Sequence, residues 1–462
     1  MPSKFLNAPL FESRGLMLDI SRNRVPTMDT LKRLIDVLQQ LHYNELQLYT
    51  EHSFAYSKHE TVWQGYSPMT ANEIREVDRY CAARGIELIA NQNSFGHMER
   101  WLRHEPYRNL AECPEGFIHP ISGEQKFPST LFPCEESLNF IDELYAELLP
   151  NFSSTQVHVG GDEPWELGKG RSKDQVKQEG KHRVYLEHMQ AVFDLAKKHG
   201  RQPQFWADII LERPDLVSEL PKNVVPVIWG YDADSPYAEQ CKTVAEAGFA
   251  GKYYVAPGAG NWNSFGGRLD VARTNILLAA HEGQANKAQG LLLTAWGDNG
   301  HHQPGPTLYP AMILAAYACH GQDVDDRQLA ELIDEFFYPD TQQGNGEALI
   351  ELGKIDALLP QPLPPISFLH AALFADPTKR YELMQRTSIE SIQTTLKQLD
   401  AIATEELDPE IRLGIDLNRH AAELCLNLPH SAPIEELKER FADLWCQNSR
   451  EGGLQESLAA FG

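Results

Sequence analysis

Residues 158–163 read HVGGDE, in which two glycines are followed directly by two carboxylic acids. Two carboxyl groups held close together cannot ionise equally, so their surroundings split their pKa values. That separation suits one proton donor and one anion. Gly160 and Gly161 relax the backbone, so Asp162 and Glu163 can both reach one pocket, although neighbouring strand residues normally point to opposite faces. The alternative is a helix N-terminus whose acidic residues complement the helix dipole.

Polar and aromatic side chains also gather where other apolar, strand-like runs end. Tryptophans occupy four of these points, at positions 206, 229, 262 and 296. A sugar ring presents apolar C–H faces that stack on aromatic walls, while its hydroxyl groups need polar partners. One such tryptophan alone would be assigned to the core. Four of them at strand ends, beside Asp, Asn, Arg and Glu, predict a shared carbohydrate pocket.

Short apolar runs alternate with helical patterns in the first two thirds of the chain. We expect strands over 16–20, 45–50, 86–91, 156–161, 203–208, 224–230, 252–257 and 290–297, each followed by a helix. Thr27 and Thr70 stand at N-cap positions, and Gly85 and Gly200 follow basic last turns, as helix-ending glycines do. This alternation implies parallel strands joined by right-handed crossovers.

Eight strand–helix units predict an α/β fold, a (β/α)8 TIM barrel, in which catalytic groups lie where strands end and loops begin. A doubly wound open sheet is the alternative, and it is weakened because no GxGxxG follows the first strand. From about Asp323 onward the pattern is helical without strand signals. We therefore expect a catalytic barrel over residues 1–322 and an α-helical C-terminal domain over residues 323–462.

Composition excludes several classes of partner. The 462-residue chain has a formal net charge of −24, which argues against a nucleic-acid backbone or an anionic membrane surface. Its seven cysteines are scattered without a CxxC, so we expect free thiols in a reducing, cytoplasmic compartment and no metal site. We see no signal peptide and no apolar run of the ~18 residues that suggest a membrane span.

The residues described so far resemble glycoside hydrolase family 20, the β-N-acetylhexosaminidases. HVGGDE matches the His-x-Gly-x-Asp-Glu signature of that family, and RGLMLDISRN, YNELQLYTE, IELIANQNSFGH and AWGDNG resemble its first, second, third and eighth strands. The resemblance covers residues 14–321 and is greatest to the compact hexosaminidase D-like branch. It implies an exo-acting enzyme that removes terminal β-linked GlcNAc or GalNAc without a cofactor. In that family the substrate's own 2-acetamido oxygen is the nucleophile.

The resemblance also implies roles for single residues. Glu163 would be the general acid and then the base that activates water, and Asp162 would orient the acetamido N–H and stabilise an oxazolinium intermediate. Arg14 would bind the O3 and O4 hydroxyls, and Asp298 would accept from O4 or O6. The aromatic walls and the supporting polar groups of the expected pocket are Trp206, Trp229, Trp262, Trp296, Glu51, His97 and His158; for His97 a merely structural role is the alternative.

Two positions depart from the family's pattern. Many members have an Asp where this chain has Asn93, four residues before His97, and this difference changes the charge of the supporting network. The tyrosine that donates to the acetamido oxygen usually follows the seventh strand in a Tyr-Leu-Asp context, which this chain lacks. Tyr231, at the end of the sixth strand, is the candidate for that role, and Tyr254 is the reserve.

Two other functions stay open on the sequence. A non-catalytic sugar-binding barrel is disfavoured because a pure binder has no need of a proton donor. A metal-dependent barrel lyase or isomerase would need several converging ligands, which His158, Asp162, Glu163 and Asp208 could supply. The expected partner is a small glycoside or oligosaccharide. The oligomeric state is left open, with a homodimer as one option.

Overall fold

The structure, a computed structural model, describes residues 5–121, 123–340, 344–362, 364–402 and 406–461. Within these residues, eight parallel strands close into a barrel in the order β1-β10-β9-β8-β7-β6-β3-β2. They are β1 (Ser13–Asp19), β2 (Glu45–Thr50), β3 (Glu87–Gln92), β6 (Gln156–His158), β7 (Gln202–Trp206), β8 (Val225–Gly230), β9 (Tyr254–Pro257) and β10 (Gly290–Ala295). Since β1 pairs with both β2 and β10, the predicted barrel is confirmed and the open sheet is wrong.

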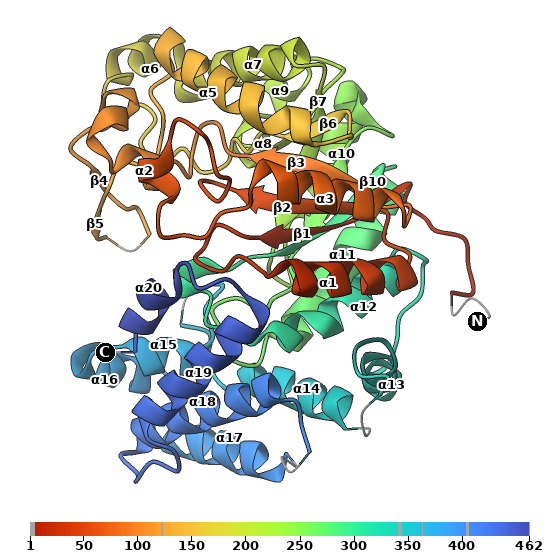
Figure 1. Cartoon of the computed structure of the whole chain (residues 1–462), viewed down its shortest axis with the longest axis vertical. Helices are drawn as coiled ribbons and strands as arrows, with labels where there is room; N and C mark the ends of the chain where they lie inside the picture. Colours follow the sequence, from red (N-terminus) through yellow and green to blue (C-terminus); the bar gives the residue numbers. More distant parts are fainter. Residues whose placement is uncertain (1–4, 122, 341–343, 363, 403–405, 462) are drawn as a thin grey trace.

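Helices join successive strands around the outside of the barrel (Figure 1). The longer ones are α1 (Met28–Gln40), α3 (Ala71–Ala82), α5 (Glu135–Leu148), α7 (Lys181–Lys198), α10 (Tyr237–Val244), α11 (Leu269–Ala285) and α12 (Tyr309–Ala318). Shorter ones lie within the connections: α2 (Glu60–Trp63), α4 (Glu99–Leu102), α6 (Lys173–Glu179), α8 (Asp208–Leu211) and α9 (Pro214–Val217). The helix expected between the predicted strands 203–208 and 224–230 is reduced in the structure to the one-turn helices α8 and α9.

The predicted helix ends are present in the structure. The Thr27 side chain accepts from the backbone N–H of Thr30 at the start of α1, and Thr70 forms a capping box with Glu73 at the start of α3. These bonds satisfy N–H groups that have no partner inside the helix. Gly85 and Gly200 adopt left-handed φ values of 71° and 72°, which glycine accommodates without steric cost.

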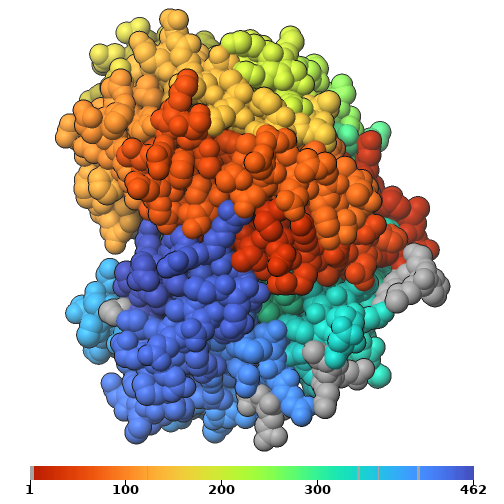
Figure 2. All heavy atoms as spheres, in the orientation of Figure 1, coloured from red at the N-terminus to blue at the C-terminus, as the bar shows by residue number. Residues whose placement is uncertain are grey.

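The C-terminal part of the described chain is helical and packs on one side of the barrel (Figures 1 and 2). Its helices are α13 (Asp326–Phe337), α14 (Asn345–Lys354), α15 (Phe368–Phe374), α16 (Pro377–Met384), α17 (Ile389–Ala401), α18 (Pro409–Leu426), α19 (Ile434–Asn448) and α20 (Leu454–Ala459). Helix α12 is buried along almost its whole length, because it lies between barrel strands and this helical region. Whether residues 323–462 fold as a separate domain stays a prediction.

The connection between β3 and α5 was not anticipated from the sequence. It contains α4 and a small hairpin of β4 (Phe117–Ile118) and β5 (Gln125–Lys126). Two-residue strands leave no detectable periodicity, so the pattern gave no signal. The hairpin lies on the side of the molecule toward which the β1, β2 and β3 arrows point in Figure 1.

Among the described residues, no helix has the length and apolar character needed to cross a membrane.

Candidate active site

The two glycines after β6 bend the backbone around the paired acids. Gly160 and Gly161 have φ values of 72° and 99°, and Glu163 is itself left-handed at 46°. A left-handed non-glycine residue costs about 1–2 kcal/mol, so the packing around it must compensate. The Tyr185 hydroxyl donates to the carbonyl of Gly161 at 2.9 Å and holds this bend. As predicted, the bend lets both acids face the strand ends, where His97 approaches each of them.

His97 links the two acids in different ways. Its Nε2 lies 3.0 Å from Asp162 Oδ2 and 3.6 Å from Glu163 Oε2. Burial lowers the pKa of His97, but the charge and the hydrogen bond of Asp162, with a smaller contribution from the charge of Glu163, together raise that pKa to about 9. The ring is then an imidazolium at neutral pH. Arg22 Nη2 lies 3.4 Å from His97 Nδ1, and this contact can be a hydrogen bond only if the ring is neutral. The imidazolium instead donates its hydrogen bond from Nε2 to Asp162.

The environments of the two acids separate their pKa values. Burial raises the pKa of Glu163 to about 7, opposed by His97 and reinforced by the charges of Asp162 and Asp298. Burial also acts to raise the pKa of Asp162, but the charge and hydrogen bond of His97 outweigh it and lower that pKa. Glu163 can therefore hold a proton near neutral pH while Asp162 is ionised. One oxygen of Asp162, Oδ1, is buried without a hydrogen-bond partner among the described residues.

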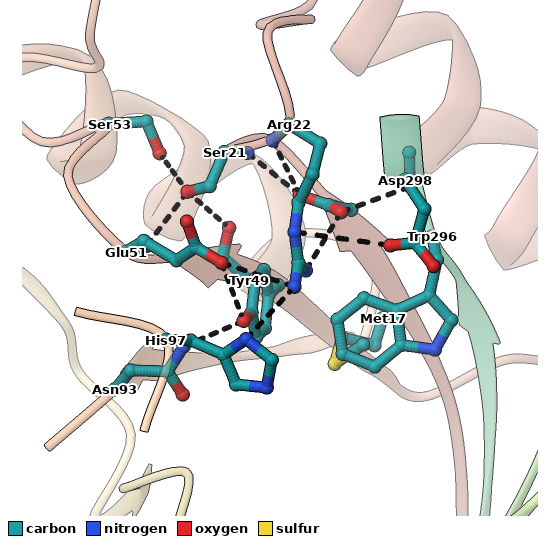
Figure 3. A network of polar contacts seen from close by, with 12 residues as sticks. Met17, Ser21, Arg22, Tyr49, Glu51, Ser53, Asn93, His97, Trp296 and Asp298 are labelled. Carbon is teal, nitrogen blue, oxygen red and sulfur yellow. Dashed lines mark hydrogen bonds and ion pairs between the residues drawn. The ribbon is translucent and has the colours of Figure 1, made fainter. Parts of the chain in front are cut away.

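Arg22 is the centre of a polar network at the ends of β1, β2 and β10 (Figure 3). Its guanidinium lies 3.1 Å from Asp19, 3.2 Å from Glu51 and 4.0 Å from Asp298. These neighbouring charges raise the pKa of Arg22 against the effect of burial, so the side chain is always cationic. The group is also stacked over the Tyr49 and Trp296 rings, with Cζ 4.6 and 5.0 Å from their centroids.

The assignment of Arg14 to this pocket is wrong. Arg14 lies near the beginning of β1, and its guanidinium donates to the backbone carbonyls of Phe11, Glu12 and His42. In a parallel barrel the beginnings of the strands form the end opposite to the site. Arg22 follows the C-terminal end of the same strand and meets Asp298 and Glu51 there. The sequence signal that distinguishes the two arginines is their position before or after the apolar run.

Behind Arg22, a chain of hydrogen bonds supports Glu51. The Tyr49 hydroxyl donates to Glu51 Oε1 at 3.0 Å, and the amide of Asn93 donates to the Tyr49 oxygen at 2.7 Å. Glu51 thus supports the pocket through Arg22, while His97 contacts the two acids directly. The neutral Asn93 is a donor in this network, a role that an ionised Asp at that position would not fill.

Aromatic side chains from successive strands line the same region. Trp206, Trp262 and Trp296 belong to one cluster with Tyr49, and Trp229 and Tyr231 pack against it. Tyr231 stacks on Trp229 with ring centroids 5.0 Å apart and meets Trp262 edge-on at 5.2 Å. Tyr254, the reserve candidate, lies at the beginning of β9 and donates to Glu45 at 2.9 Å. Tyr231 is therefore the tyrosine of the two that stands in the pocket.

His158 is buried and Asp208 is partly buried beside the paired acids. His158 Nδ1 accepts from the Gly160 N–H at 3.1 Å, and its ring lies 4.3 Å from the Trp206 ring. Burial lowers the pKa of His158 to about 3, so the ring is neutral. Asp208, one of the four possible metal ligands in the sequence, begins α8 shortly after β7 and is partly buried. Burial together with the charges of Asp162 and Glu163 raises its pKa to about 8.

A separate cavity of about 600 Å³ lies where α1, α12 and the start of α18 meet. It touches Asp19, Asn261 and Trp296, but neither Asp162 nor Glu163 lines it. We therefore place the site at the converging side chains of the strand ends.

Converging carboxyl groups, an aromatic wall and a partly buried arginine at the strand ends of a (β/α)8 barrel are typical of the class of glycoside-processing barrel enzymes. Residues 11–251 match the model of glycosyl hydrolase family 20, catalytic domain. Human Hexosaminidase D is 26% identical over 67% of this chain and 65% of its own length. A β-N-acetylhexosaminidase structure from Bacteroides fragilis aligns with a TM-score of 0.55 at 20% identity, over 72% of this chain and 71% of that one. A Flavobacterium johnsoniae chitobiase structure aligns with a TM-score of 0.56 at 17% identity, over 97% and 78% of the two chains.

The family model covers more than half of the chain. The chain belongs to glycosyl hydrolase family 20, a family of glycoside hydrolases. The similarity to the human relative extends over less than two thirds of that protein.

Proposed function

We propose that this chain is an exo-acting β-N-acetylhexosaminidase that hydrolyses terminal β-linked GlcNAc or GalNAc with the substrate's own acetamido group as nucleophile. The observation that carries this proposal is the state of Asp162. One of its oxygens bonds His97, and the other is buried with no partner among the described residues. A buried carboxylate oxygen without a donor is costly, and the N–H of an acetamido group would satisfy it.

The proposed reaction has two steps. Glu163 gives its proton to the glycosidic oxygen while the acetamido carbonyl oxygen attacks C1, so the aglycone leaves and an oxazolinium ion forms. Asp162 accepts a hydrogen bond from the N–H group of that ion and stabilises its positive charge. Tyr231 donates a hydrogen bond to the acetamido oxygen. The ionised Glu163 then takes a proton from water, whose oxygen attacks C1 and restores the acetamide with overall retention.

The remaining side chains bind the terminal sugar. Arg22 and Asp298 supply a donor and an acceptor for ring hydroxyls, and the tryptophans cover the apolar faces of the ring and the acetamido methyl group. Binding of terminal hydroxyls favours exo action. GlcNAc and GalNAc both fit this proposal, because the two sugars differ only in the orientation of the O4 hydroxyl group.

Two readings of the same barrel compete with this proposal. A sugar-binding protein would not need the raised pKa of Glu163. A lyase or isomerase would need a cation, which His158, Asp162, Glu163 and Asp208 would have to hold. His158 uses the lone pair of Nδ1 to accept a hydrogen bond from the Gly160 N–H, and Asp162 is already hydrogen-bonded to His97. Both contacts compete with metal binding. Full loss of activity in EDTA, restored by a divalent ion, would favour the lyase or isomerase.

Comparative kinetics test the proposal. The purified chain should hydrolyse aryl β-GlcNAc or aryl β-GalNAc and leave aryl β-glucoside essentially uncleaved, because the glucoside has no acetamido nucleophile. Stable oxazoline mimics should inhibit strongly, since a ligand resembling the transition state binds more tightly than substrate. Comparable kcat/KM on the glucoside, or a covalent sugar trapped on a carboxylate, would contradict the mechanism.

A further inference from the structure

A group of side chains in the helical region, far along the chain from the strand ends, has the composition of a metal site. His420 and Glu423 are three residues apart on α18, and His430 lies in the segment that leads to α19. One possible ligand atom from each of the three lies within 4.8 Å of the others. Two imidazoles and a carboxylate are a donor set that suits zinc and its neighbours in the first transition row.

The hydrogen bonding of His420 prepares one nitrogen for a metal. Its Nδ1 lies 2.9 Å from the backbone carbonyl of Ala432. A carbonyl oxygen can only accept, so Nδ1 carries the proton and Nε2 keeps its lone pair. This is how metal-binding histidines are commonly oriented by a second hydrogen bond. Because His420 is 5% exposed, its ring is also held in place by packing.

Glu423 is the anionic member of the group. Its side chain is 6% exposed and accepts from the backbone N–H and the hydroxyl of Ser431. Each carboxylate oxygen has a second lone pair, so these bonds leave room for a cation. The Nδ1 of His430 lies 3.8 Å from Glu423 Oε2, and its ring stacks on the His420 ring at 4.1 Å.

Nearby charge does not block a cation. The guanidinium of Arg380 donates to the carbonyls of Ala372 and Ala375 at 2.9 and 2.6 Å, so it does not bind Glu423 in the described structure. Tetrahedral zinc with bonds of about 2.1 Å holds its ligand atoms roughly 3.4 Å apart. In the structure the possible ligand atoms of the three residues lie within 4.8 Å of one another, so they must move closer to bind an ion. To close that gap, the His430 ring must turn out of its stack on His420 so that its in-plane lone pair points at the ion. The His430 side chain is 34% exposed and lies between two helices, which leaves it room for this rotation.

We propose that His420, Glu423 and His430 form a binding site for one zinc-class divalent ion, which ties the C-terminal half of α18 to the segment entering α19. Water completes the tetrahedral set. The site is an accessory to the fold and takes no part in the glycosidase reaction.

Metal binding by the 462-residue chain, produced without an affinity tag, tests the proposal. Zinc bound after dialysis is measured by mass spectrometry, and the Tm is measured with Zn²⁺ and with Mg²⁺. We expect one zinc ion per chain and a Tm increase of at least about 2 °C with Zn²⁺, since a ligand that binds only the folded state stabilises it. Mg²⁺, which prefers oxygen ligands, should have no effect.

Variants locate the ion. His430→Gln and Glu423→Gln should each weaken zinc affinity by at least about 10²-fold, because each removes a direct ligand. His430 is partly exposed, so its replacement should leave the fold intact. His281→Gln and Cys446→Ser are matched controls, since they remove an exposed histidine on α11 and the exposed thiol on α19; both should bind zinc as the parent does.

Three results would overturn the site: no zinc retained by the parent protein, equal retention by the His430→Gln and Glu423→Gln variants, or loss of zinc in Cys446→Ser. Co²⁺ in place of zinc should give a tetrahedral spectrum without thiolate charge transfer. None of these readouts depends on hydrolysis, so failure of the zinc site and failure of the proposed function are distinguishable.

Discussion

At the scale of single residues, Asp162 and Glu163 are chemically similar neighbours that the structure holds in different states. His97 lies 3.0 Å from Asp162 and stabilises its ionised form, whereas burial raises the pKa of Glu163 to about 7. Their difference therefore comes from the surroundings and from the left-handed turn that separates the two side chains. Predictions about proton transfer and sugar binding belong at this scale.

Activity should fall as the pH rises through about 7. Glu163 must be protonated to act as an acid, and its raised pKa of about 7 means that this form is lost above that pH. Asp162 must be ionised, and its lowered pKa keeps it so until the pH falls well into the acidic range. The measurement is the pH dependence of kcat/KM on an aryl β-GlcNAc. A basic limb only at pH values where lysines titrate would contradict the assignment.

Glu163→Gln should lose roughly 10²–10⁴-fold in activity on substrates with poor leaving groups, which is the usual worth of general acid–base catalysis. The loss should be smaller on aryl glycosides with very good leaving groups, because these need little protonation. Steady-state kinetics on both kinds of substrate provide the comparison. If the variant keeps a near-parental kcat on a natural disaccharide, another group is the acid.

Arg22 and Arg14 offer a matched pair of substitutions. Arg22→Lys removes the fork that contacts Asp19 and Glu51 and should reduce kcat/KM by roughly 10–100-fold, as expected for loss of charge-assisted hydrogen bonds. Arg14→Lys acts at the opposite end of β1 and should leave kcat/KM nearly unchanged. A larger loss of kcat/KM in Arg14→Lys than in Arg22→Lys would show that Arg14, and not Arg22, binds the substrate.

At the scale of elements, the site depends on how closely two loops approach each other. The loop after β3 and the loop after β6 touch at Gly96, where an added Cβ would lie 2.3 Å from the backbone oxygen of Asp162. Glu166 holds the same two loops together, because its carboxylate accepts from the backbone N–H groups of Ser129 and Thr130. The position of His97 against Asp162 therefore follows from packing between loops.

Gly96→Ala should reduce kcat/KM by about 10²-fold or more, since the methyl group forces the β3 and β6 loops apart and misplacement of catalytic groups by ~1 Å costs this much. Gly85→Ala is the control. It also replaces a glycine near β3, but its added Cβ meets nothing within 4 Å. That variant should lose about 1–2 kcal/mol of stability, because alanine does not favour the positive φ at this position, and should keep its kcat/KM. Equal kinetics for the two variants would show that the loop contact is unimportant.

At the scale of the whole molecule, the helical region is fastened to the site end of the barrel. Arg24, just after β1, contacts Glu410 on α18 at 3.1 Å and also donates to Ser449 and to the carbonyl of Gln303. In addition, Glu456 on α20 bonds Arg100 at 2.6 Å. The blue C-terminal helices in Figure 2 lie directly against the red N-terminal segment for this reason.

Arg24→Met should destabilise the protein by about 3–5 kcal/mol, because it leaves the carboxylate of Glu410 buried without its cation. Adding Glu410→Met should restore part of this loss, since the unpaired charge is then gone. Urea unfolding of the single and double variants measures both effects. Arg213→Met, which breaks an exposed pair with Asp215, is the control and should change little. Simple additivity of the two core substitutions would argue against a coupled ion pair.

Much of the architecture could be predicted from the sequence because it depends on local patterns. The strand over residues 45–50, the caps at Thr27 and Thr70 and the glycines at 85 and 200 all follow from periodicity and backbone chemistry over a few residues. The bend in HVGGDE could also be predicted, because Gly160 and Gly161 adopt positive φ values at low energetic cost. The β4–β5 hairpin was missed because its two-residue strands carry no period.

The sequence by itself determined the barrel, the paired acids and the tryptophans at the strand ends, because each depends on residue type and spacing along the chain. Only the tertiary structure decided that Arg22 rather than Arg14 enters the pocket, since the two ends of one strand look alike until the barrel closes. It also decided which carboxyl keeps a proton, because that depends on His97 and on burial. The grouping of His420, Glu423 and His430 arose in the same way, from a helix and a loop that meet only after folding.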